Sequence, residues 1–432
     1  MFVSDCISVD EKGHLTIGGM DTVELAKEFG TPCFVMDEQR IRKNCRAYVD
    51  SIQKNYDGNG LVTYASKAFC CKEICRIVTE EGLGLDVVSG GEIYTALSAG
   101  VKAEKLHFHG NNKTPEELEY AVSNGVGRII VDNLFELEML SRIAAQSNKT
   151  VNILLRIKPG IDAHTHDFIR TGQIDSKFGL AIETGEAMQG VEAALKAENI
   201  CLKGLHCHIG SQIFDVDPFE LAAEVMIDFI ADVKAKTGFE AQELDLGGGF
   251  GIKYKSSDNP LAYEEYMAKV ATVLKKKCAE RQVKTPFVLI EPGRSVTGSA
   301  GLTLYTVGAV KTIPEVRTYV SIDGGMGDNP RYILYQAEYE ILCASKANEP
   351  KTQIVTLAGR CCESGDLIQE NAPIQPVEAG DVVAVLSTGA YNYSMASNYN
   401  RIPRPPVVMV NNGRARVIVR RESYEDIIKN DI

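Results

Sequence analysis

From Leu61 to Glu291, short apolar runs rich in β-branched residues alternate with longer amphipathic stretches. This alternation is typical of repeated strand–helix units around a parallel sheet. The candidate strands are LVTYASK (from 61), GLDVVS (84), KLHFHG (105), GRIIVD (127), NILLRIKP (152), LKGLHCH (202), ELDLGGG (243) and PFVLIEPG (286). Eight strands with intervening helices predict a (β/α)8 TIM-like barrel, which takes about 250 residues, with a doubly wound sheet as the alternative.

Helix signals fall between these strands. Thr114 is an N-cap residue that precedes Pro115, and proline suits the first position of a helix. The stretch from Phe219 to Gly238 ends in the glycine that commonly follows a helix. Both segments therefore predict helices that connect neighbouring strands.

After about Gly298 the pattern changes to strands without helices between them. The strand-like runs are GLTLYTVGAV, RTYVSID, TQIVTLAG, DVVAVLS and VVMVNNGRARVIV. The last run predicts a hairpin, because Asn411-Asn412-Gly413 supplies residues that tolerate positive φ at the turn. We therefore expect an all-β domain, a sandwich or barrel, to follow the α/β barrel.

The N-terminal segment FVSDCISVDEKGHLTIGG predicts two short strands joined at Gly13. We expect these strands to pack on the C-terminal β domain. The expected domains are residues 33–291 for the barrel, and residues 1–32 with 292–432 for a β domain that completes the substrate site.

Length and composition support two domains and limit the function. At 432 residues the chain exceeds the size at which a single core stops growing. No apolar run is long enough to cross a membrane, and the net charge of −12 disfavours nucleic acid as a partner. The 12 cysteines, together with an N-terminal segment that lacks a secretory or transit signal, predict a cytoplasmic protein with reduced thiols.

Polar and glycine residues follow several of the predicted barrel strands. In a (β/α)8 barrel the chemistry lies at the carboxyl ends of the strands, so these residues should converge on one site. They are Ser66-Lys67, His206-Cys207-His208, Gly247-Gly248-Gly249 and Glu291-Pro292-Gly293-Arg294.

Three of these strand ends have a chemical interpretation and a structural alternative. Partial desolvation of Lys67 would favour the neutral amine that attacks aldehydes, whereas a solvated lysine would only pair with an acid. Glu291 could keep a pyridine nitrogen protonated, or it could pair with Arg294. His208 could stack on a flat ring or carry a proton, or it could be a hydrogen-bonded core residue.

The glycine run from Leu246 to Gly251 lets backbone N–H groups close around a phosphate, or it serves packing alone. It is neither a dinucleotide fingerprint nor a Walker loop, so a small phosphate ligand fits better than a nucleotide. Asp162, His164 and His166 offer ligand types for a metal ion, but their spacing matches no common zinc pattern. We therefore expect no metal site.

Taken in order, these motifs resemble the diaminopimelate decarboxylase family, which belongs to the barrel-type, fold type III pyridoxal-phosphate decarboxylases. The similarity covers nearly the whole chain. Its motifs are YASKA (64–68), GNNK (110–113), HTH through SKFG (164–179), HCHIGS (206–211), DLGGGFGI (245–252), EPGR (291–294), Arg331 to Tyr335, CESGD (362–366) and GAY (389–391).

The resemblance implies pyridoxal 5'-phosphate as the cofactor and Lys67 as its covalent anchor. Residues implied to take part in catalysis are Lys67, His208 and Cys362. The implied cofactor contacts are Lys67, Asp86, His208, Ser211, Gly248, Gly249, Glu291, Gly293, Arg294 and Tyr391. The implied substrate contacts are Arg294, Arg331, Tyr335, Glu363 and Tyr391.

The resemblance also implies decarboxylation of meso-2,6-diaminopimelate to L-lysine, the last step of lysine biosynthesis. The two arginines would bind the distal carboxylate and Glu363 the distal ammonium. Cys362 would donate a proton from the partner subunit, which implies a homodimer with shared active sites. The doubled Cys361-Cys362 raises the question of which thiol acts, and the spacing to Glu363 favours Cys362.

Other activities share this pattern of residues. A decarboxylase of the same fold that acts on ornithine, arginine or carboxynorspermidine would use the same cofactor contacts. Glu363 after Cys362 argues against ornithine, because a substrate without a distal carboxylate does not need both Arg331 and Glu363. A catalytically silent regulator would not need Lys67, and CESGD is not expected in a barrel-type racemase.

Overall fold

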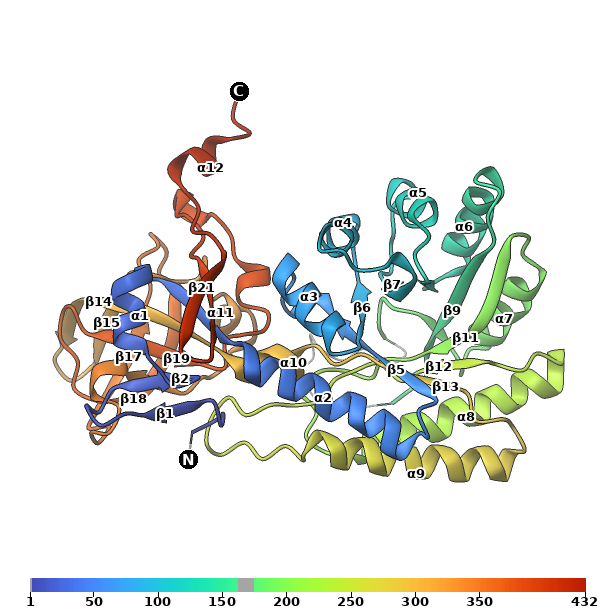
Figure 1. The fold of residues 1–432 in the computed structure, drawn as a ribbon, viewed down its shortest axis with the longest axis horizontal. Helices are drawn as coiled ribbons and strands as arrows, with labels where there is room; N and C mark the ends of the chain where they lie inside the picture. The colour runs from blue at the N-terminus through green and yellow to red at the C-terminus, as the bar shows by residue number, and fades with distance from the viewer. Residues whose placement is uncertain (1, 162–174) are drawn as a thin grey trace. The chain divides into compact units, whose positions relative to one another are not determined.

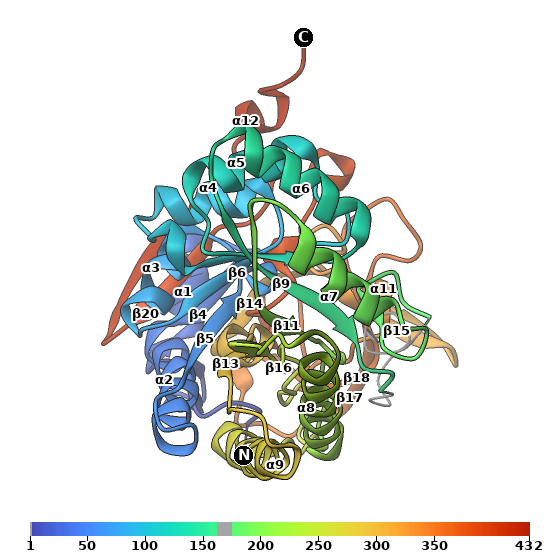
Figure 2. The same ribbon diagram turned by 90° about the vertical axis from the view of Figure 1, so that its right-hand side faces the viewer.

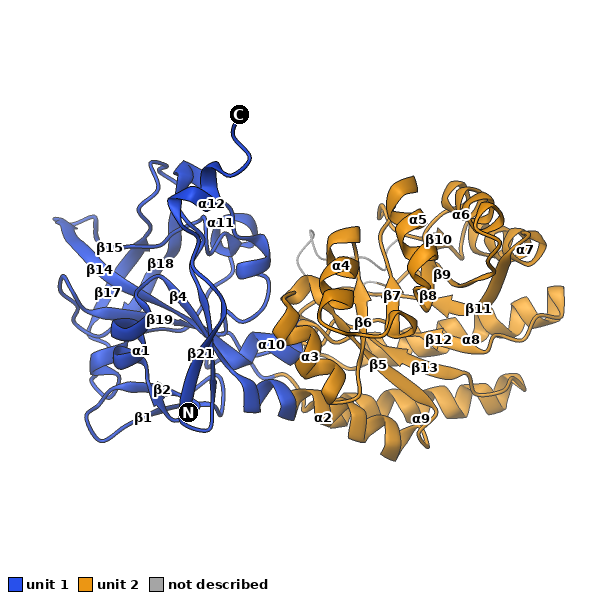
Figure 3. Ribbon diagram, turned by 45° about the horizontal axis from the view of Figure 1, so that its top comes forward, with its two compact units in different colours: residues 1–43, 252–259, 294–432 blue, residues 44–251, 260–293 orange. Residues whose placement is uncertain are grey.

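The computed structural model describes residues 2–161 and 175–432, and the chain divides into two compact units (Figure 3). The unit that we call the barrel unit comprises residues 44–251 and 260–293. The unit that we call the β unit comprises residues 1–43, 252–259 and 294–432. Among the described residues, no helix is both long and apolar enough to cross a membrane.

The barrel unit contains a closed parallel sheet of eight strands, which confirms the predicted (β/α)8 barrel. The strands are β5 (Gly60–Ala65), β6 (Gly84–Val87), β7 (Leu106–Phe108), β8 (Arg128–Val131), β9 (Val151–Lys158), β11 (Ile200–His206), β12 (Glu243–Asp245) and β13 (Phe287–Ile290). In this order, each strand pairs with the next one, and the last strand, β13, pairs with the first, β5. This closure excludes the doubly wound sheet. The short strand β10 (Leu180–Ala181) pairs with β9.

Helices lie on the outside of this sheet (Figures 1 and 2). They are α3 (Lys72–Glu80), α4 (Gly90–Ser98), α5 (Pro115–Asn124), α6 (Leu134–Gln146), α7 (Glu186–Lys196), α8 (Asp217–Thr237) and α9 (Tyr263–Arg281). Helix α5 begins as predicted, with a reciprocal capping box between Thr114 and Glu117. Helix α8 is followed by Gly238, whose φ of 75° places it in the left-handed region.

The β unit contains a larger sheet and a small N-terminal one. The larger sheet consists of β4 (Cys33–Asp37), β14 (Gly301–Ile313), β15 (Arg317–Ile322), β16 (Ile341–Cys343), β17 (Gln353–Ala358), β18 (Leu367–Ile374), β19 (Val382–Leu386), β20 (Val407–Asn411) and β21 (Arg414–Val419). The small sheet consists of β1 (Ile7–Val9), β2 (Leu15–Ile17) and β3 (Met20–Asp21). The predicted hairpin joins β20 to β21, with φ of 50° at Asn412 and 73° at Gly413.

The N-terminal strands pack where the sequence predicted. Ile7 and Leu15 belong to one buried cluster with Leu302, Leu304 and Val408 from the C-terminal part of the chain. The helices of this unit are α1 (Thr22–Phe29), α10 (Arg294–Thr297), α11 (Arg331–Tyr335) and α12 (Tyr424–Ile428). The burial of apolar side chains from both ends of the chain in one cluster explains why these ends belong to the same unit.

The bounds of the units differ from the expected division at residue 33. Strand β4 pairs antiparallel with β14 and parallel with β20, both in the β unit. Helix α2 (Glu38–Asn55) then runs from the β unit into the barrel unit. The sequence CFVMD of β4 is as apolar as a barrel strand, so only its hydrogen-bond partners reveal the sheet to which it belongs.

Candidate active site

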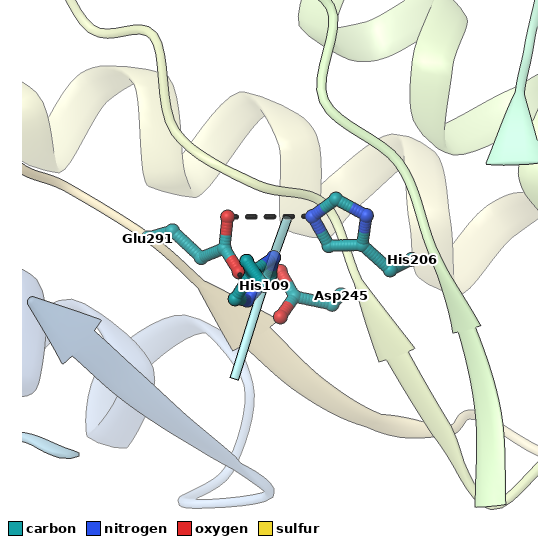
Figure 4. A group of neighbouring side chains, drawn as sticks. All are labelled: His109, His206, Asp245 and Glu291. Carbon is teal, nitrogen blue, oxygen red and sulfur yellow. Dashed lines mark hydrogen bonds and ion pairs between the residues drawn. The ribbon is translucent and has the colours of Figure 1, made fainter. Parts of the chain in front are cut away.

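The carboxyl ends of the barrel strands bring together five ionisable side chains, which we call the strand-end cluster. They come from β6, β11 and β12 and from the residues directly after β7 and β13. The cluster consists of Asp86, His109, His206, Asp245 and Glu291, all of them buried, and Figure 4 shows the last four. Charged groups at this depth are retained only when they compensate one another.

Glu291 is the centre of the cluster. Its Oε1 lies 2.8 Å from Nε2 of His109, and its Oε2 lies 3.3 Å from Nε2 of His206. Burial alone would raise the pKa of Glu291, but the two histidines hold that pKa well below its usual range. Glu291 is therefore a buried carboxylate that stays ionised.

The neighbouring carboxyl groups titrate differently. Burial raises the pKa of Asp245 well above its usual value, and the charge of Glu291 raises it further. Burial also raises the pKa of Asp86 to about 6, although the charges of His109 and Lys67 oppose this shift. Among these carboxyl groups, the surroundings therefore favour the protonated form most at Asp245.

The glycines after β12 have no room for side chains. A Cβ on Gly248 would lie 2.1 Å from the carbonyl oxygen of Glu291, and one on Gly249, whose φ is 117°, would lie 2.6 Å from that of Gly210. The N–H of Gly247 donates to Oδ1 of Asp245 at 2.8 Å, and the N–H of Gly248 donates to Nδ1 of His208 at 3.2 Å. These two N–H groups therefore already have hydrogen-bond partners. The chief contribution of the glycines after β12 is the space that their missing side chains leave.

Lys67 lies in the short turn η1 (Ser66–Ala68), directly after β5. Its side chain is exposed, which differs from the expected partial desolvation, because the chain has left the buried strand at Ala65. Its charge nevertheless acts on the site. Burial and the charges of Lys67 and Arg156 lower the pKa of His208 well below its usual value, so this imidazole is neutral.

The β unit brings together a second group of predicted residues. The guanidinium of Arg294 lies 4.7 Å from the ring centre of Tyr391, and that of Arg331 lies 5.5 Å from the same ring. Arg331 also lies 5.1 Å from the ring of Tyr335. Nη1 of Arg294 donates to the hydroxyl of Tyr254, a residue that no sequence motif indicated. Two buried cations and their aromatic neighbours suit an anionic group.

Cys362 and Glu363 lie on an exposed loop between β17 and β18. The carboxylate of Asp366 fixes this loop, because Oδ1 accepts from Met326 N at 2.5 Å and Oδ2 accepts from Cys361 N at 2.6 Å. Burial and the charge of Asp366 raise the pKa of Cys361 to about 11. Cys362 is thus the more accessible thiol, and Cys361 is a weak acid.

The predicted site residues are therefore divided between the two units. The barrel unit contains Lys67, Asp86, His208, Ser211, Gly248, Gly249, Glu291 and Gly293. The β unit contains Arg294, Arg331, Tyr335, Cys362, Glu363 and Tyr391. The sequence motifs did not indicate that Glu291 lies beside His109 and Asp245. The positions of these two residues at strand ends were the signal that could have revealed these contacts.

Asp162, His164 and His166, which we weighed as metal ligands, lie outside the described residues. Within the described residues, ligand atoms of four members of the strand-end cluster lie within 4.8 Å of one another, as in Figure 4. Both Nε2 atoms of its histidines face oxygens of Glu291, so we interpret the group as an internally paired network. Our expectation that the sequence contains no metal site therefore stays a prediction.

These features fit pyridoxal phosphate. A buried anion at Glu291 suits a protonated ring nitrogen, Lys67 offers an accessible amine, and Gly248 and Gly249 leave space for a ligand. Residues 38–298 match the family model described as pyridoxal-dependent decarboxylase, pyridoxal binding domain. The fold and the site thus define a pyridoxal-phosphate-dependent decarboxylase with a barrel of fold type III.

Full-length comparisons narrow the class. The chain is 49% identical to a diaminopimelate decarboxylase from Halalkalibacterium halodurans and 47% identical to one from Bacillus subtilis, each over 100% of this chain and 98% of the relative. A crystal structure of diaminopimelate decarboxylase from M. jannaschii, in complex with L-lysine, superposes with a TM-score of 0.91 at 35% identity over 100% of this chain and 99% of that one. The chain belongs to the diaminopimelate decarboxylase family.

A lysine/ornithine decarboxylase from Vibrio vulnificus is more distant. It superposes with a TM-score of 0.76 at 24% identity, and the match covers 90% of this chain and 97% of that one. This similarity shows the shared fold alone. The relatives named diaminopimelate decarboxylase are thus much more similar to the chain.

Proposed function

We propose that this protein decarboxylates meso-2,6-diaminopimelate to L-lysine and carbon dioxide, the last step of lysine biosynthesis. Within the site, the observation that carries the proposal is the pair of buried arginines, Arg294 and Arg331, that both lie close to the ring of Tyr391. A substrate with a second carboxylate requires such cations, whereas ornithine has no second carboxylate for the arginines to bind. The full-length similarity to diaminopimelate decarboxylases supports the same choice.

In this proposal the cofactor is anchored at Lys67, beside the neutral ring of His208. Bound pyridoxal phosphate supplies a ring that takes up the electron pair released when the carboxylate leaves as carbon dioxide. The Glu291 carboxylate keeps a positive charge on the ring nitrogen favourable. The phosphate would be held by Ser211, Gly248, Gly249, the Gly293-Arg294 turn and Tyr391, and Asp86 would complete the cofactor contacts.

The remaining residues orient the substrate and return a proton. Arg294 and Arg331 bind the distal carboxylate with Tyr335 and Tyr391, and Glu363 binds the distal ammonium. Cys362 donates a proton to the carbon that has lost its carboxylate. This role is supported by the exposure of Cys362, in contrast to the part-buried Cys361 with its raised pKa.

The direct test is an assay of the purified protein with pyridoxal phosphate and meso-diaminopimelate. Lysine and carbon dioxide should form with wild type and with Lys72→Ala, which changes an exposed lysine of α3, but not with Lys67→Ala. Ornithine and arginine are assayed in parallel. Faster turnover of ornithine than of diaminopimelate would refute the substrate assignment.

We also propose a homodimer in which Cys362 and Glu363 complete the active site of the second subunit. The exposure of the loop that contains these two residues supports this arrangement. We propose separately that the protein is cytoplasmic, which its 12 free thiols support. Dissociating and reassociating Lys67→Ala with Cys362→Ala should restore about a quarter of wild-type activity, since half of the dimers are mixed and each has one intact site. Sites built from a single chain would give no recovery.

A further inference from the structure

The contact between Asp245 and Glu291 carries an inference beyond the assigned roles. Both side chains are buried at the carboxyl ends of adjacent strands, and a carboxyl oxygen of Asp245 lies within 4.8 Å of one of Glu291. Oδ1 of Asp245 accepts the N–H of Gly247 at 2.8 Å. Oδ2 of Asp245 is buried, and no N–H or O–H group of the described residues donates to it. That oxygen is therefore left for a contact with Glu291.

Two carboxyl groups in such contact cannot both be ionised, because like charges without solvent between them repel strongly. A single proton placed between them converts the repulsion into a hydrogen bond. The surroundings decide where this proton resides. Glu291 lies beside two imidazoles, at 2.8 Å and 3.3 Å, whereas Asp245 receives only a backbone N–H. The anion is therefore better stabilised on Glu291.

We propose that Asp245 is a positioning residue that carries a proton in the folded protein and donates a hydrogen bond from Oδ2 to Glu291. Glu291 is then the anion of the pair, in contact with His109, His206 and Asp245, the neighbours that Figure 4 shows beside it. The orientation of its carboxylate would thereby be fixed before a cofactor binds. This functional consequence rests on the proposed function, whereas the position of the proton does not.

Other titratable groups surround the pair and bear on its pH dependence. They are Asp86 on β6, His107 on β7, His109 after β7, Arg156 on β9, and His206 and Cys207 at the end of β11. Burial lowers the pKa of His107 to about 3 and raises that of Cys207, so both are neutral at pH 7. Arg156 is the permanent cation among them, and it favours one anion in the pair over none.

Asp245→Asn is the discriminating variant. The amide oxygen can still accept from Gly247 N–H, and the amide nitrogen can donate to Glu291, so Asn reproduces the protonated acid. Asp245→Ala removes both contacts. Asp232→Asn, which changes an exposed aspartate of α8, is the matched control. The Asn variant should fold and bind pyridoxal phosphate within threefold of wild type, and the Ala variant should bind at least tenfold more weakly, by order-of-magnitude expectation.

Infrared difference spectra of the full protein at pH 7 locate the proton directly. Wild type minus Asp245→Asn should show the carbonyl band of a protonated carboxylic acid, and wild type minus Asp232→Asn should not. The absence of this band would overturn the proposal. An Asn variant that fails to fold, or that binds the cofactor as weakly as Ala, would also overturn it, because an amide satisfies both assigned contacts.

Unfolding by urea at several pH values gives an independent readout. A protonated Asp245 has a higher pKa in the folded than in the unfolded chain, so folding takes up a proton and wild type loses stability as the pH rises above about 4. The unfolding constant of wild type relative to Asp245→Asn should rise up to roughly tenfold per pH unit between pH 5 and 8. The opposite slope would show an ionised Asp245. None of these readouts requires turnover, so failure of the proposed decarboxylation would leave them intact.

Discussion

Lys113 provides the sharpest test of how the barrel is held together. It ends the GNNK motif, for which the resemblance implied no role, and its side chain is only 1% exposed. Its Nζ donates to Gly110 O at 2.8 Å, to Ile130 O at 2.7 Å and to Oε1 of Glu136 at 2.7 Å. It thereby joins the end of β7, strand β8 and helix α6. We expect Lys113→Met to destabilise the barrel unit without touching any residue of the proposed site.

The magnitude follows from what the substitution leaves behind. Removing one partner of a buried ion pair costs about 3–5 kcal/mol, because the other charge stays buried and unpaired. In Lys113→Met, Glu136 would be that charge, and two backbone carbonyls would lose a donor as well. At about 1.4 kcal/mol per tenfold change, protection against hydrogen exchange should fall by roughly two to four decades. The assay is native-state exchange in peptides that span β7 and β8.

Two further variants separate this explanation from general damage. Lys102→Met changes a lysine that is 76% exposed and should alter protection by less than about tenfold. Lys113→Met combined with Glu136→Gln should destabilise the protein by about 0.5–3 kcal/mol less than the sum of the two single changes, because the buried charge is gone. Protection in Lys113→Met within tenfold of wild type would refute the reasoning and show that the freed groups find other partners.

Three further predictions concern the site. Gly248→Ala places a Cβ 2.1 Å from a backbone carbonyl oxygen and should abolish the absorbance of bound cofactor, whereas Gly365→Ala, with no atom within 4 Å, should keep it. Cys362→Ala should lower kcat far more than Cys361→Ala, and equal effects would contradict the assignment of Cys362. Asp366→Ala frees the loop that contains Cys362 and should lower kcat with cofactor absorbance unchanged, while lost absorbance would indicate wider disruption.

The sequence predicted the barrel because its strands are buried on both faces and therefore appear as short apolar runs, such as GRIIVD around β8. Turn residues were equally informative, as in the Asn412-Gly413 hairpin. Strand β4 shows the limit of this approach. Its residues Cys33–Asp37 are all buried, like a barrel strand, yet they pair with β14 and β20. An apolar run reports burial and does not report which sheet supplies the hydrogen bonds.

For the site, the sequence indicates individual residues but does not indicate which side chains those residues contact. Lys67 and Glu291 stand out in the sequence because they interrupt apolar strands at the end where barrel chemistry lies. The two histidines that flank Glu291 come from β11 and from the turn after β7, at sequence separations of 85 and 182 residues, as the numbering of His206 and His109 shows. No local pattern encodes such distant pairs, and only the closed sheet brings them together.

The strand-end cluster also explains how a barrel can keep a buried anion ready for a positively charged group. A single buried carboxylate without partners would become protonated, and it would then offer nothing to a cation. The two imidazoles favour the ionised form of Glu291, and Asp245 takes the proton that Glu291 does not accept. Within the pair, the negative charge is therefore confined to Glu291, whose orientation the neighbouring side chains fix. Such an arrangement needs no reorganisation when a cation arrives, which is the property that a preorganised electrostatic site requires.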